Sequence, residues 1–398
     1  MDGRNYVCAD CIEDCALQEV VREHAISEEC DYCRRRAKKP IACELSEVIE
    51  RIRWAIDQEY NDPNEELPWD EGSYCGTVID GPEILAEIDF CIENTQLLDD
   101  ISDAFGDDAF CKRDYYEPSH QDTFGFAWSH FKEVVQHQRR YTFWTVEDEG
   151  EFQNPSYGIT PSKLLKILEG YIDFLSPLDK LPVGTEIWRV RDFPQNDPKV
   201  IDPREYTSPP IDKAIQANRH SPPGISMFYG ANDSATAIEE TMDDDTMEDR
   251  TACAARFSTV IPLTLLDLTA IPMPESYFSS NWDRERRGAR AFLQAFADTL
   301  SEPIARDQKY HLELVPTQVF TEFIRYELKT DCAEQFHGIK YKSSRKKGGI
   351  CYVIFAHQEA FLPGPGDRKA PQLLSFVPGS IRTLSVARSK KGKKPRQQ

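Results

Sequence analysis

The stretch from Arg219 to Glu240, RHSPPGISMFYGANDSATAIEE, decides the fold of the C-terminal half of the chain. Pro222–Gly224 predicts a rigid turn, because two prolines with fixed φ precede a residue that tolerates positive φ. Ile225–Tyr229 predicts a short buried strand, and Asn232 or Asp233 predicts the N-cap of a helix that ends in the two glutamates. This compact unit brings an arginine, a tyrosine and a carboxylate to one end of a strand, which suits an anionic ligand that contains a sugar.

The composition indicates a soluble protein of several domains. The 398 residues suit two or three domains, and 40% hydrophobic residues suffice for their cores. The formal net charge of −21 opposes binding to nucleic acid through the bulk field of the chain. No signal peptide and no run long enough to span a membrane is recognisable, so we expect a cytoplasmic protein without membrane contact.

Two pairs of cysteines near the N-terminus predict a zinc site. Cys8 and Cys11 form one C-x2-C pair, Cys30 and Cys33 form the second, and eighteen residues separate the two pairs. Residues 1–45 are too few to build a core, so a bound metal would supply folding energy to this zinc-ribbon-like segment. The zinc would be structural, because four thiolates leave no open position for water.

Residues 46–176 predict a mainly helical domain, because apolar residues recur there at helical spacing. We expect the helices to pack together as a small bundle. The expected helices are Leu45–Glu59, Ile84–Ile101, Phe126–Phe143 and Thr160–Leu175.

Residues 180–362 predict a mixed α+β domain, because strand-like and helix-like patterns follow one another there. The expected strands are Thr185–Arg191, Met227–Tyr229, Cys253–Leu268 and Gly349–Ala356, and the expected helices are Ala289–Leu300 and Thr317–Leu328. Residues 386–398 are basic and contain proline, which predicts a disordered tail. This tail is the part of the chain whose charge would suit nucleic acid.

Four segments of the C-terminal half carry an ordered set of motifs. They are Trp188-Arg189, then Pro-Pro-Gly with Phe-Tyr and Ala-x-x-Glu up to Glu240, then Val-Pro-Thr-Gln at 315–318, then Gly-Ile-x-Tyr-x-Ser-Ser-Arg at 338–345. Neither a Gly-x-Gly-x-x-Gly after a strand nor a P-loop occurs, so a nucleotide would be held in another way.

This ordered set resembles the RES-domain toxins, which are named for an arginine, a glutamate and a serine. The resemblance covers roughly residues 180–360 and implies a fold similar to that of ADP-ribosyltransferases. It also implies an enzyme that cleaves the nicotinamide–ribose bond of NAD, either by hydrolysis or by phosphorolysis. The catalytic residues that it implies are Arg189, Tyr229, Glu240 and Ser343.

The chemistry of these side chains fits NAD as the substrate. Loss of nicotinamide leaves an oxocarbenium-like ribose, which the carboxylate of Glu240 would stabilise. Arg189 would bind the pyrophosphate through its forked donors, and Tyr229 would stack on the nicotinamide or its ribose. Ser343 would position the substrate by a hydrogen bond, since no neighbouring base marks it as a nucleophile.

Further assignments of the resemblance concern neighbouring residues. The residues implied to bind NAD are Arg189, Arg219, Tyr229, Ser343 and Ser344. Glu239 remains an alternative to Glu240, and Ser344 an alternative to Ser343, because each lies one residue away. His220-Ser221 stands where the family has an aromatic residue and an asparagine, so this chain departs from the pattern at that turn.

The N-terminal half resembles the HEPN/RES N-terminal domain, which suggests a regulatory or sensing role ahead of a toxin or defence effector. Arg113 and His120 have the spacing of the Arg-His motif in HEPN ribonucleases, although Pro118 lies between them. The alternatives to NAD cleavage are therefore protein ADP-ribosylation on the same fold and a HEPN-type ribonuclease or zinc-dependent nucleic-acid binder. Candidate partners are an antitoxin or regulatory protein and a second copy of the chain.

Overall fold

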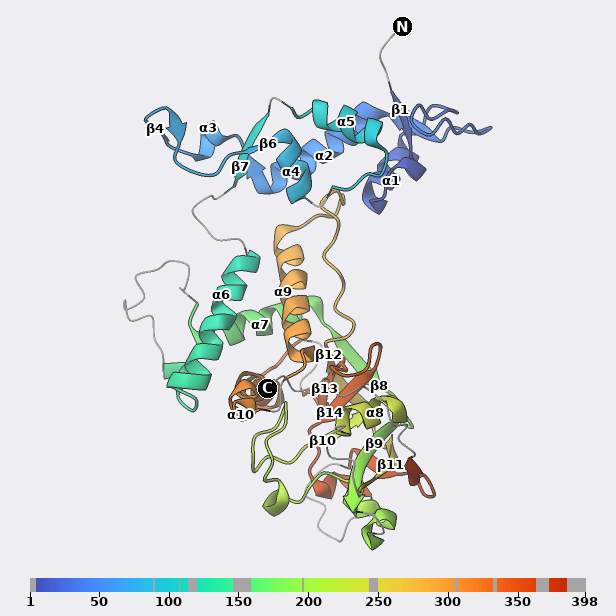
Figure 1. Cartoon of the computed structure of the whole chain (residues 1–398), viewed down its shortest axis with the longest axis vertical. Coiled ribbons are helices and arrows are strands. Elements are labelled where there is room, and N and C mark those ends of the chain that lie inside the picture. Colours follow the sequence, from blue (N-terminus) through green and yellow to red (C-terminus); the bar gives the residue numbers. More distant parts are fainter. Residues whose placement is uncertain are drawn as a thin grey trace, which may run out of the picture. The chain divides into compact units, whose positions relative to one another are not determined.

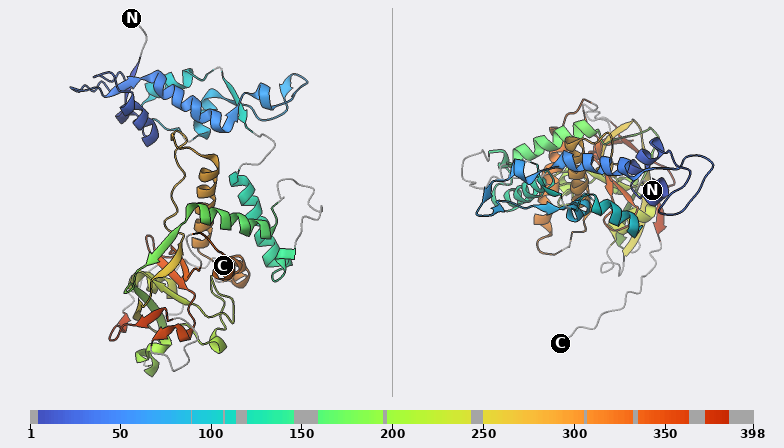
Figure 2. Two further views of the ribbon diagram at one scale, coloured as in Figure 1. Left: turned by 180° about the vertical axis from the view of Figure 1, so that it is seen from behind. Right: turned by 90° about the horizontal axis from the view of Figure 1, so that it is seen from above.

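The computed structural model divides the chain into two compact units (Figures 1 and 2). Unit 1 comprises Met1–Thr123 and Met273–Ala291, and unit 2 comprises Phe124–Pro272 and Phe292–Gln398. The residues that the structure describes are 5–88, 90–106, 108–113, 120–145, 159–194, 197–242, 250–304, 307–331, 335–362 and 372–384. The predicted tail at 386–398 lies outside them.

Unit 1 is a helical unit with small sheets at its margins. Its helices are α1 (Cys15–Glu23), α2 (Leu45–Glu59), α3 (Pro63–Glu66), α4 (Gly81–Glu87) and α5 (Thr95–Asp103). Its short strands are β1 (Tyr6–Cys8), β2 (Ala42–Glu44), β3 (Tyr60–Asn61), β4 (Trp69–Asp70), β5 (Ser73–Tyr74), β6 (Ile79–Asp80) and β7 (Ala109–Lys112). A single apolar core joins α1, α2, α4 and α5, with Leu17, Ile52, Ile56, Ile84, Ile101 and Phe105 among its buried members.

The helix predictions for unit 1 are confirmed in one case and wrong in another. Helix α2 has the predicted bounds Leu45–Glu59. The single helix expected over Ile84–Ile101 is instead broken into α4 and α5. The break arises because Asn94 caps a new helix start, where its side chain accepts a hydrogen bond from the Leu97 backbone N–H.

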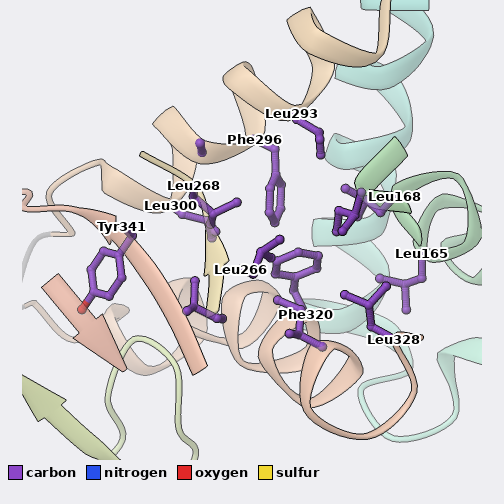
Figure 3. Close-up of a cluster of buried hydrophobic side chains, with 14 of the residues drawn as sticks. Leu165, Leu168, Leu266, Leu268, Leu293, Phe296, Leu300, Phe320, Leu328 and Tyr341 are labelled. Carbon is purple, nitrogen blue, oxygen red and sulfur yellow. The ribbon is translucent and has the colours of Figure 1, made fainter. Parts of the chain in front are cut away.

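The expected bundle over residues 46–176 is also wrong, because its last two helices belong to the core of unit 2. These helices are α6 (His120–Glu133), which continues as a π-helical turn over Val134–Gln138, and α7 (Pro161–Leu175), which Thr160 caps as predicted. Their apolar faces pack with residues of the sheet and of later helices, as Figure 3 shows for Leu165, Leu168, Leu266, Phe296 and Phe320. The domain boundary predicted near residue 176 therefore differs from the division into compact units.

Unit 2 is built on a curled mixed sheet of ten described strands. The strands are β8 (Leu178–Leu181), β9 (Glu186–Pro194), β10 (Phe228–Ala231), β11 (Arg250–Thr259), β12 (Leu263–Asp267), β13 (Gly338–Lys342), β14 (Ile350–Ile354), β15 (Phe361–Leu362), β16 (Leu374–Phe376) and β17 (Arg382–Leu384). Their order is β15-β16-β11-β9-β10-β14-β13-β12-β8, and β17 also pairs with β11. The pairs β12–β13 and β15–β16 are parallel and the others are antiparallel.

The prediction from the sequence treated two of these strands as one. The strand expected over Cys253–Leu268 is two strands, β11 and β12, which a turn containing Pro262 separates. The other strand predictions and both helix predictions of this half are confirmed, with ends shifted by a few residues. The remaining helices are α8 (Ser234–Thr241), α9 (Arg284–Ser301), α10 (Tyr310–Glu313) and α11 (Val315–Tyr326).

Two strands far apart in the sequence flank β10, and this placement builds the site. Strand β10 lies between β9 and β14, with Ala231 opposite Trp188 and Tyr229 opposite Val353. Of the two residues predicted to cap α8, Asn232 and Asp233, the N-cap is Asp233, whose carboxylate accepts a hydrogen bond from the Thr236 backbone N–H. Among the described residues, no helix combines the length and apolarity that crossing a bilayer needs.

Candidate functional site

Unit 2 contains a pocket of about 970 Å³, a volume in the range of small-molecule sites. Its walls come from β9, β10, β14, α8 and the segments around residues 209–221 and 303–314. The charged residues of the lining are the cations Arg189, Arg191, Lys213, Arg219, Arg250 and Arg345 and the acids Asp192 and Glu240. The lining is thus cationic although the whole chain is strongly acidic, which favours an anionic ligand.

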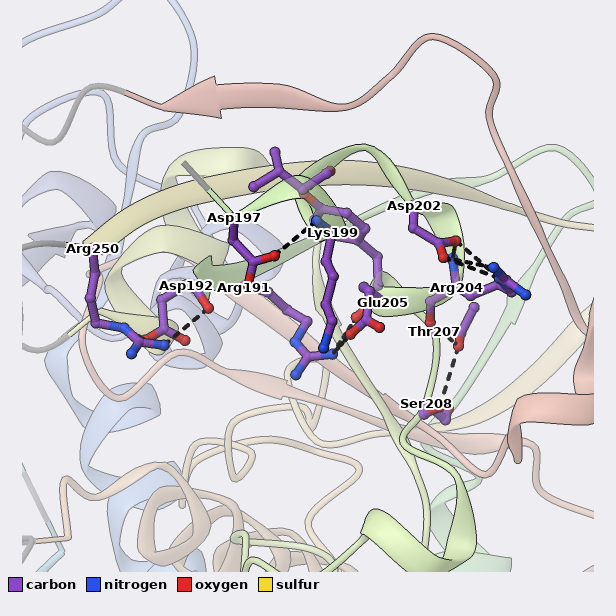
Figure 4. Close-up of polar contacts among 12 residues, drawn as sticks. Arg191, Asp192, Asp197, Lys199, Asp202, Arg204, Glu205, Thr207, Ser208 and Arg250 are labelled. Carbon is purple, nitrogen blue, oxygen red and sulfur yellow. Dashed lines mark hydrogen bonds and ion pairs between the residues drawn. The ribbon is translucent and has the colours of Figure 1, made fainter. Parts of the chain in front are cut away.

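Two of these cations, Arg191 and Arg250, already bond other residues of the protein (Figure 4). Arg250 forms an ion pair with Asp192, and Arg191 donates to the backbone carbonyl of Glu205. These contacts fix the two arginines in place, and they leave less of their charge for a ligand.

Arg189 lies on β9, half-buried, with its guanidinium turned toward β10. Its Nη1 donates to the backbone carbonyl of Tyr229 at 2.8 Å, and its guanidinium lies 5.1 Å from the centre of the Phe228 ring. Its Nε is buried without a hydrogen-bond partner among the described residues. Burial and, second, the charge of Arg191 lower the pKa of Arg189 to about 9, so it remains a cation at neutral pH.

Tyr229 lies beside Arg189, on β10, and contributes to the pocket wall. Its hydroxyl lies 2.8 Å from the hydroxyl of Ser221, at the start of the Pro-Pro-Gly turn. Burial raises the pKa of Tyr229 well above its ordinary value, so the phenol is neutral.

Glu240 and Ser343 form the central hydrogen bond of the site. Glu240 lies in the last turn of α8, lines the pocket and accepts a hydrogen bond from Ser343 Oγ at 2.5 Å. Its neighbour Glu239 is exposed and is not part of the pocket lining. Of the two glutamates that the sequence left open, the structure places Glu240 in the pocket.

Ser343 is held by its own loop. Its Oγ accepts hydrogen bonds from the backbone N–H groups of Arg345 (3.2 Å) and Lys346 (3.0 Å). Because a hydroxyl has one proton, these two donors leave that proton for Glu240. Ser344 lines the pocket, whereas Ser343 contacts it through Glu240.

The loop after β13 also forms hydrogen bonds with both ends of α8. Lys346 Nζ bonds the capping carboxylate of Asp233 at 2.9 Å, and Arg345 Nη1 donates to the backbone carbonyls of Glu239 and Met242. Burial opposes ionisation of Asp233, but hydrogen bonds from Thr236 and Lys346 lower its pKa to about 2. The helix that carries Glu240 is therefore fixed at its two termini.

Arg219 has a role that the sequence did not predict. Its Nη1 donates to the carbonyl of Leu300 and its Nη2 to that of Glu302 at 2.6 Å, so it binds the carbonyl end of α9. It lines the pocket beside Pro303 and Ile304. A phosphate contact by Arg219 stays a prediction, and both of its Nη donors are engaged in the structure.

Two further pocket residues were missed. Tyr341 and Cys351 are almost fully buried and line the pocket from β13 and β14. Burial, and next the charge of Glu240, raise the pKa of Cys351 above its usual range, so the thiol is neutral. The Gly-Ile-x-Tyr motif could have identified Tyr341, because alternation along a strand places it on the same face as Ile339 and Ser343.

The four N-terminal cysteines come together in unit 1. All their sulfur atoms lie within 4.8 Å of one another, and the Cys8–Cys11, Cys8–Cys33 and Cys11–Cys30 sulfur pairs are 3.8, 3.5 and 3.8 Å apart. A tetrahedral Zn²⁺ with Zn–S bonds of about 2.3 Å requires sulfur atoms roughly 3.8 Å apart. The cluster could therefore hold a metal ion of this kind.

The surroundings of the cluster suit thiolate ligands. Burial raises the pKa of Cys30, but backbone N–H donors of Cys33, Tyr32 and Cys8 outweigh burial and lower it. Burial raises the pKa of Cys8 to about 12, and binding of a metal ion would release the proton of this thiol to solvent. Within the described part of the chain, no other group of cysteines, histidines and acids has such a geometry.

The described residues include only part of the Arg-His motif of the N-terminal half. Arg113 donates to the backbone carbonyls of Asp57 and Tyr60 at 2.8 and 3.3 Å. Residues 114–119 and the side chain of His120 lie outside the described residues.

Two family models match the chain. Residues 23–149 match the model of HEPN/RES N-terminal domain 1, and residues 186–368 match that of the RES domain. No curated protein and no solved structure matches the chain. The RES match contains all four candidate catalytic residues, Arg189, Tyr229, Glu240 and Ser343. The chain therefore carries a HEPN/RES N-terminal domain in front of a RES domain.

Proposed function

We propose that the chain is a toxin or defence effector that consumes NAD by cleaving its nicotinamide–ribose bond. RES domains are associated with NAD-utilising toxins, so NAD is the substrate that the family supports. The observation that carries the proposal is the 2.5 Å hydrogen bond between Ser343 and Glu240 at a pocket that Arg189 and Tyr229 also line. Glu240 is the carboxylate of this grouping, and the other lining acid, Asp192, is paired with Arg250.

Each side chain then has a distinct task. The carboxylate of Glu240 stabilises the positive charge that develops on the ribose as neutral nicotinamide leaves. Ser343 fixes the direction of that carboxylate through its single proton. Arg189 supplies a desolvated cation whose Nε has no hydrogen-bond partner within the described part of the chain, which suits one of the two phosphates.

The acceptor of the ribosyl group is water or inorganic phosphate in this proposal. A protein side chain as acceptor would make the chain an ADP-ribosyltransferase. The product distinguishes the three: free ADP-ribose, its phosphorylated form, or a labelled protein.

The test is nicotinamide release by the purified full chain, with and without phosphate. We expect release by the wild type and a loss of about 100-fold or more in Glu240→Gln, because an amide cannot stabilise a cation as a carboxylate does. Glu239→Gln is the matched control, since Glu239 is exposed outside the pocket, and it should keep full activity. Equal rates in the wild type and in Glu240→Gln would refute the proposal.

We also propose that Cys8, Cys11, Cys30 and Cys33 bind one structural zinc ion. The sulfur spacing and the N–H donors around Cys30 support this assignment. The ion would stabilise the fold of the N-terminal segment and take no part in the chemistry at the pocket. A cytoplasmic location and a regulatory role of the N-terminal half, through an antitoxin or another partner, complete the proposal.

A further inference from the structure

A small turn in the wall of the pocket contacts both α11 and Tyr229. Its two ends are Asn218 and Ser221, whose backbones exchange hydrogen bonds of 2.9 and 3.3 Å. The buried side chain of Gln318 on α11 donates to the carbonyl of Asn218 at 2.8 Å and to that of Ser221 at 3.4 Å. The turn is therefore held by a side chain of the protein interior.

His220 anchors the same turn a second time. Its ring is fully buried, and its Nδ1 lies 3.0 Å from Thr321 Oγ1. Thr321 gives its single proton to the carbonyl of Thr317 at 2.8 Å, so it accepts the hydrogen bond from Nδ1–H of His220. Burial, and next the charge of Arg219, lower the pKa of His220 to about 3. His220 is thus a neutral anchor that does not titrate near neutral pH.

The turn presents Ser221 to the phenol of Tyr229, with Oγ 2.8 Å from the Tyr229 hydroxyl. The amide nitrogen of Asn218, which can only donate, lies 3.5 Å from Ser221 Oγ. This order of donors favours a chain that runs from Asn218 through Ser221 to Tyr229, and it leaves the proton of Tyr229 free.

We propose that Ser221 is a positioning residue for the reaction: it donates its proton to the Tyr229 hydroxyl and thereby directs the proton of Tyr229 into the pocket. The inference rests on the proposed NAD-cleaving function. Tyr229 then donates a hydrogen bond to a ribose or phosphate oxygen of the dinucleotide, in addition to stacking. A donor whose direction is fixed before the ligand binds needs no reorganisation during the reaction.

The first test is a double-mutant cycle on nicotinamide release. Ser221→Ala should lower kcat/KM about tenfold in the wild type, the effect of losing one directed hydrogen bond. In a Tyr229→Phe background it should change kcat/KM by less than about twofold, because the group that Ser221 positions is already absent. An equal loss in both backgrounds, or no loss in the wild type, would overturn the positioning role.

Ser380→Ala is the matched control for this cycle. Ser380 is also a fully buried serine of unit 2, but it lies outside the pocket lining, and among the described residues its hydroxyl bonds only the backbone of Arg256. It should leave kcat/KM unchanged in both backgrounds.

The second test observes the phenol directly and does not depend on turnover. In protein labelled with ¹³C at tyrosine Cζ, the signal that disappears in Tyr229→Phe belongs to Tyr229. Ser221→Ala should shift this signal and Ser380→Ala should not. An unchanged signal in Ser221→Ala would overturn the proposal whatever the activity, whereas a shifted signal in a protein that consumes no NAD supports the hydrogen bond and refutes the proposed function instead.

Discussion

The hydroxyl of Ser343, which contacts the pocket through Glu240, has three hydrogen-bond partners. Two backbone N–H groups donate to its oxygen, so its proton points at the carboxylate of Glu240. Hydrogen bonds to a charged group contribute more than those between neutral groups, about 1.5–3 kcal/mol. The single serine therefore orients the group on which the proposed chemistry depends.

Replacement of the two neighbouring serines should separate their roles. Ser343→Ala should reduce kcat/KM for nicotinamide release about 10- to 100-fold, because Glu240 loses its donor. Ser344→Ala should cost less, since Ser344 lines the pocket without bonding the carboxylate among the described contacts. Steady-state kinetics on both variants measure the two losses. A larger loss of kcat/KM in Ser344→Ala would assign the positioning role to Ser344 instead of Ser343.

At the level of elements, α8 is a short helix, and contacts from residues outside it hold Glu240 in position. Its start is capped by Asp233 and its last carbonyls are bonded by Arg345. The loop that supplies Arg345 and Lys346 approaches α8 so closely that a Cβ on Gly349 would lie 2.7 Å from Thr236. The helix and the loop therefore act as one structural element of the site.

Loss of the cap should weaken both stability and activity. Asp233→Asn should lower the free energy of unfolding of unit 2 by about 0.5–1 kcal/mol at pH 7, a modest amount because the Lys346 contact is partly exposed. The folded-state pKa of Asp233 is depressed to about 2, so this difference is present above its unfolded pKa near 4 and is lost as the pH falls toward 2. Urea unfolding of the wild type and of Asp233→Asn as a function of pH measures this difference in the free energy of unfolding.

The control for this prediction is Asp62→Asn, which removes a helix-capping carboxylate in unit 1. It should leave nicotinamide release unchanged, whereas Asp233→Asn should reduce it. Full activity in Asp233→Asn would show that α8 holds Glu240 without its cap.

In the whole molecule, two units have separate hydrophobic cores. One core joins the helices around α2 in unit 1, and the largest core of unit 2 joins α6, α7, α9 and α11 to the sheet. The cysteine cluster belongs to unit 1, where it packs with Tyr6 and Ala42 beside the first two strands. A metal there would contribute to the stability of unit 1 specifically.

Removal of zinc should therefore affect one of two unfolding transitions. We expect about one zinc per chain by elemental analysis, and we expect a chelator or Cys30→Ser to lower the transition of unit 1 while that of unit 2 persists. Cys75→Ser, at an exposed cysteine outside the cluster, should change neither the metal content nor the transitions. Wild-type metal content in Cys30→Ser would contradict the assignment.

The sequence by itself determined the local features of this protein. The helix bounds of α2 and the start of α7 follow from neighbouring residues, and the structure has them as predicted. The sequence also placed the cap of α8 at Asn232 or Asp233, and the structure has it at Asp233. The motifs also identified the RES domain, because their order and spacing can be read from the sequence without knowing how the chain packs. Periodicity failed where a cap or a proline interrupts a continuous apolar pattern, as at Asn94 and Pro262.

Only the tertiary structure decided which side chains meet. It placed Glu240 rather than Glu239 in the pocket, gave the proton of Ser343 to that carboxylate and turned both Nη donors of Arg219 toward the end of α9. It also moved α6 and α7 from the expected bundle to the core of the sheet. The physical reason is that hydrophobic periodicity shows which face of an element is buried, whereas its partner depends on how segments far apart in the chain pack together.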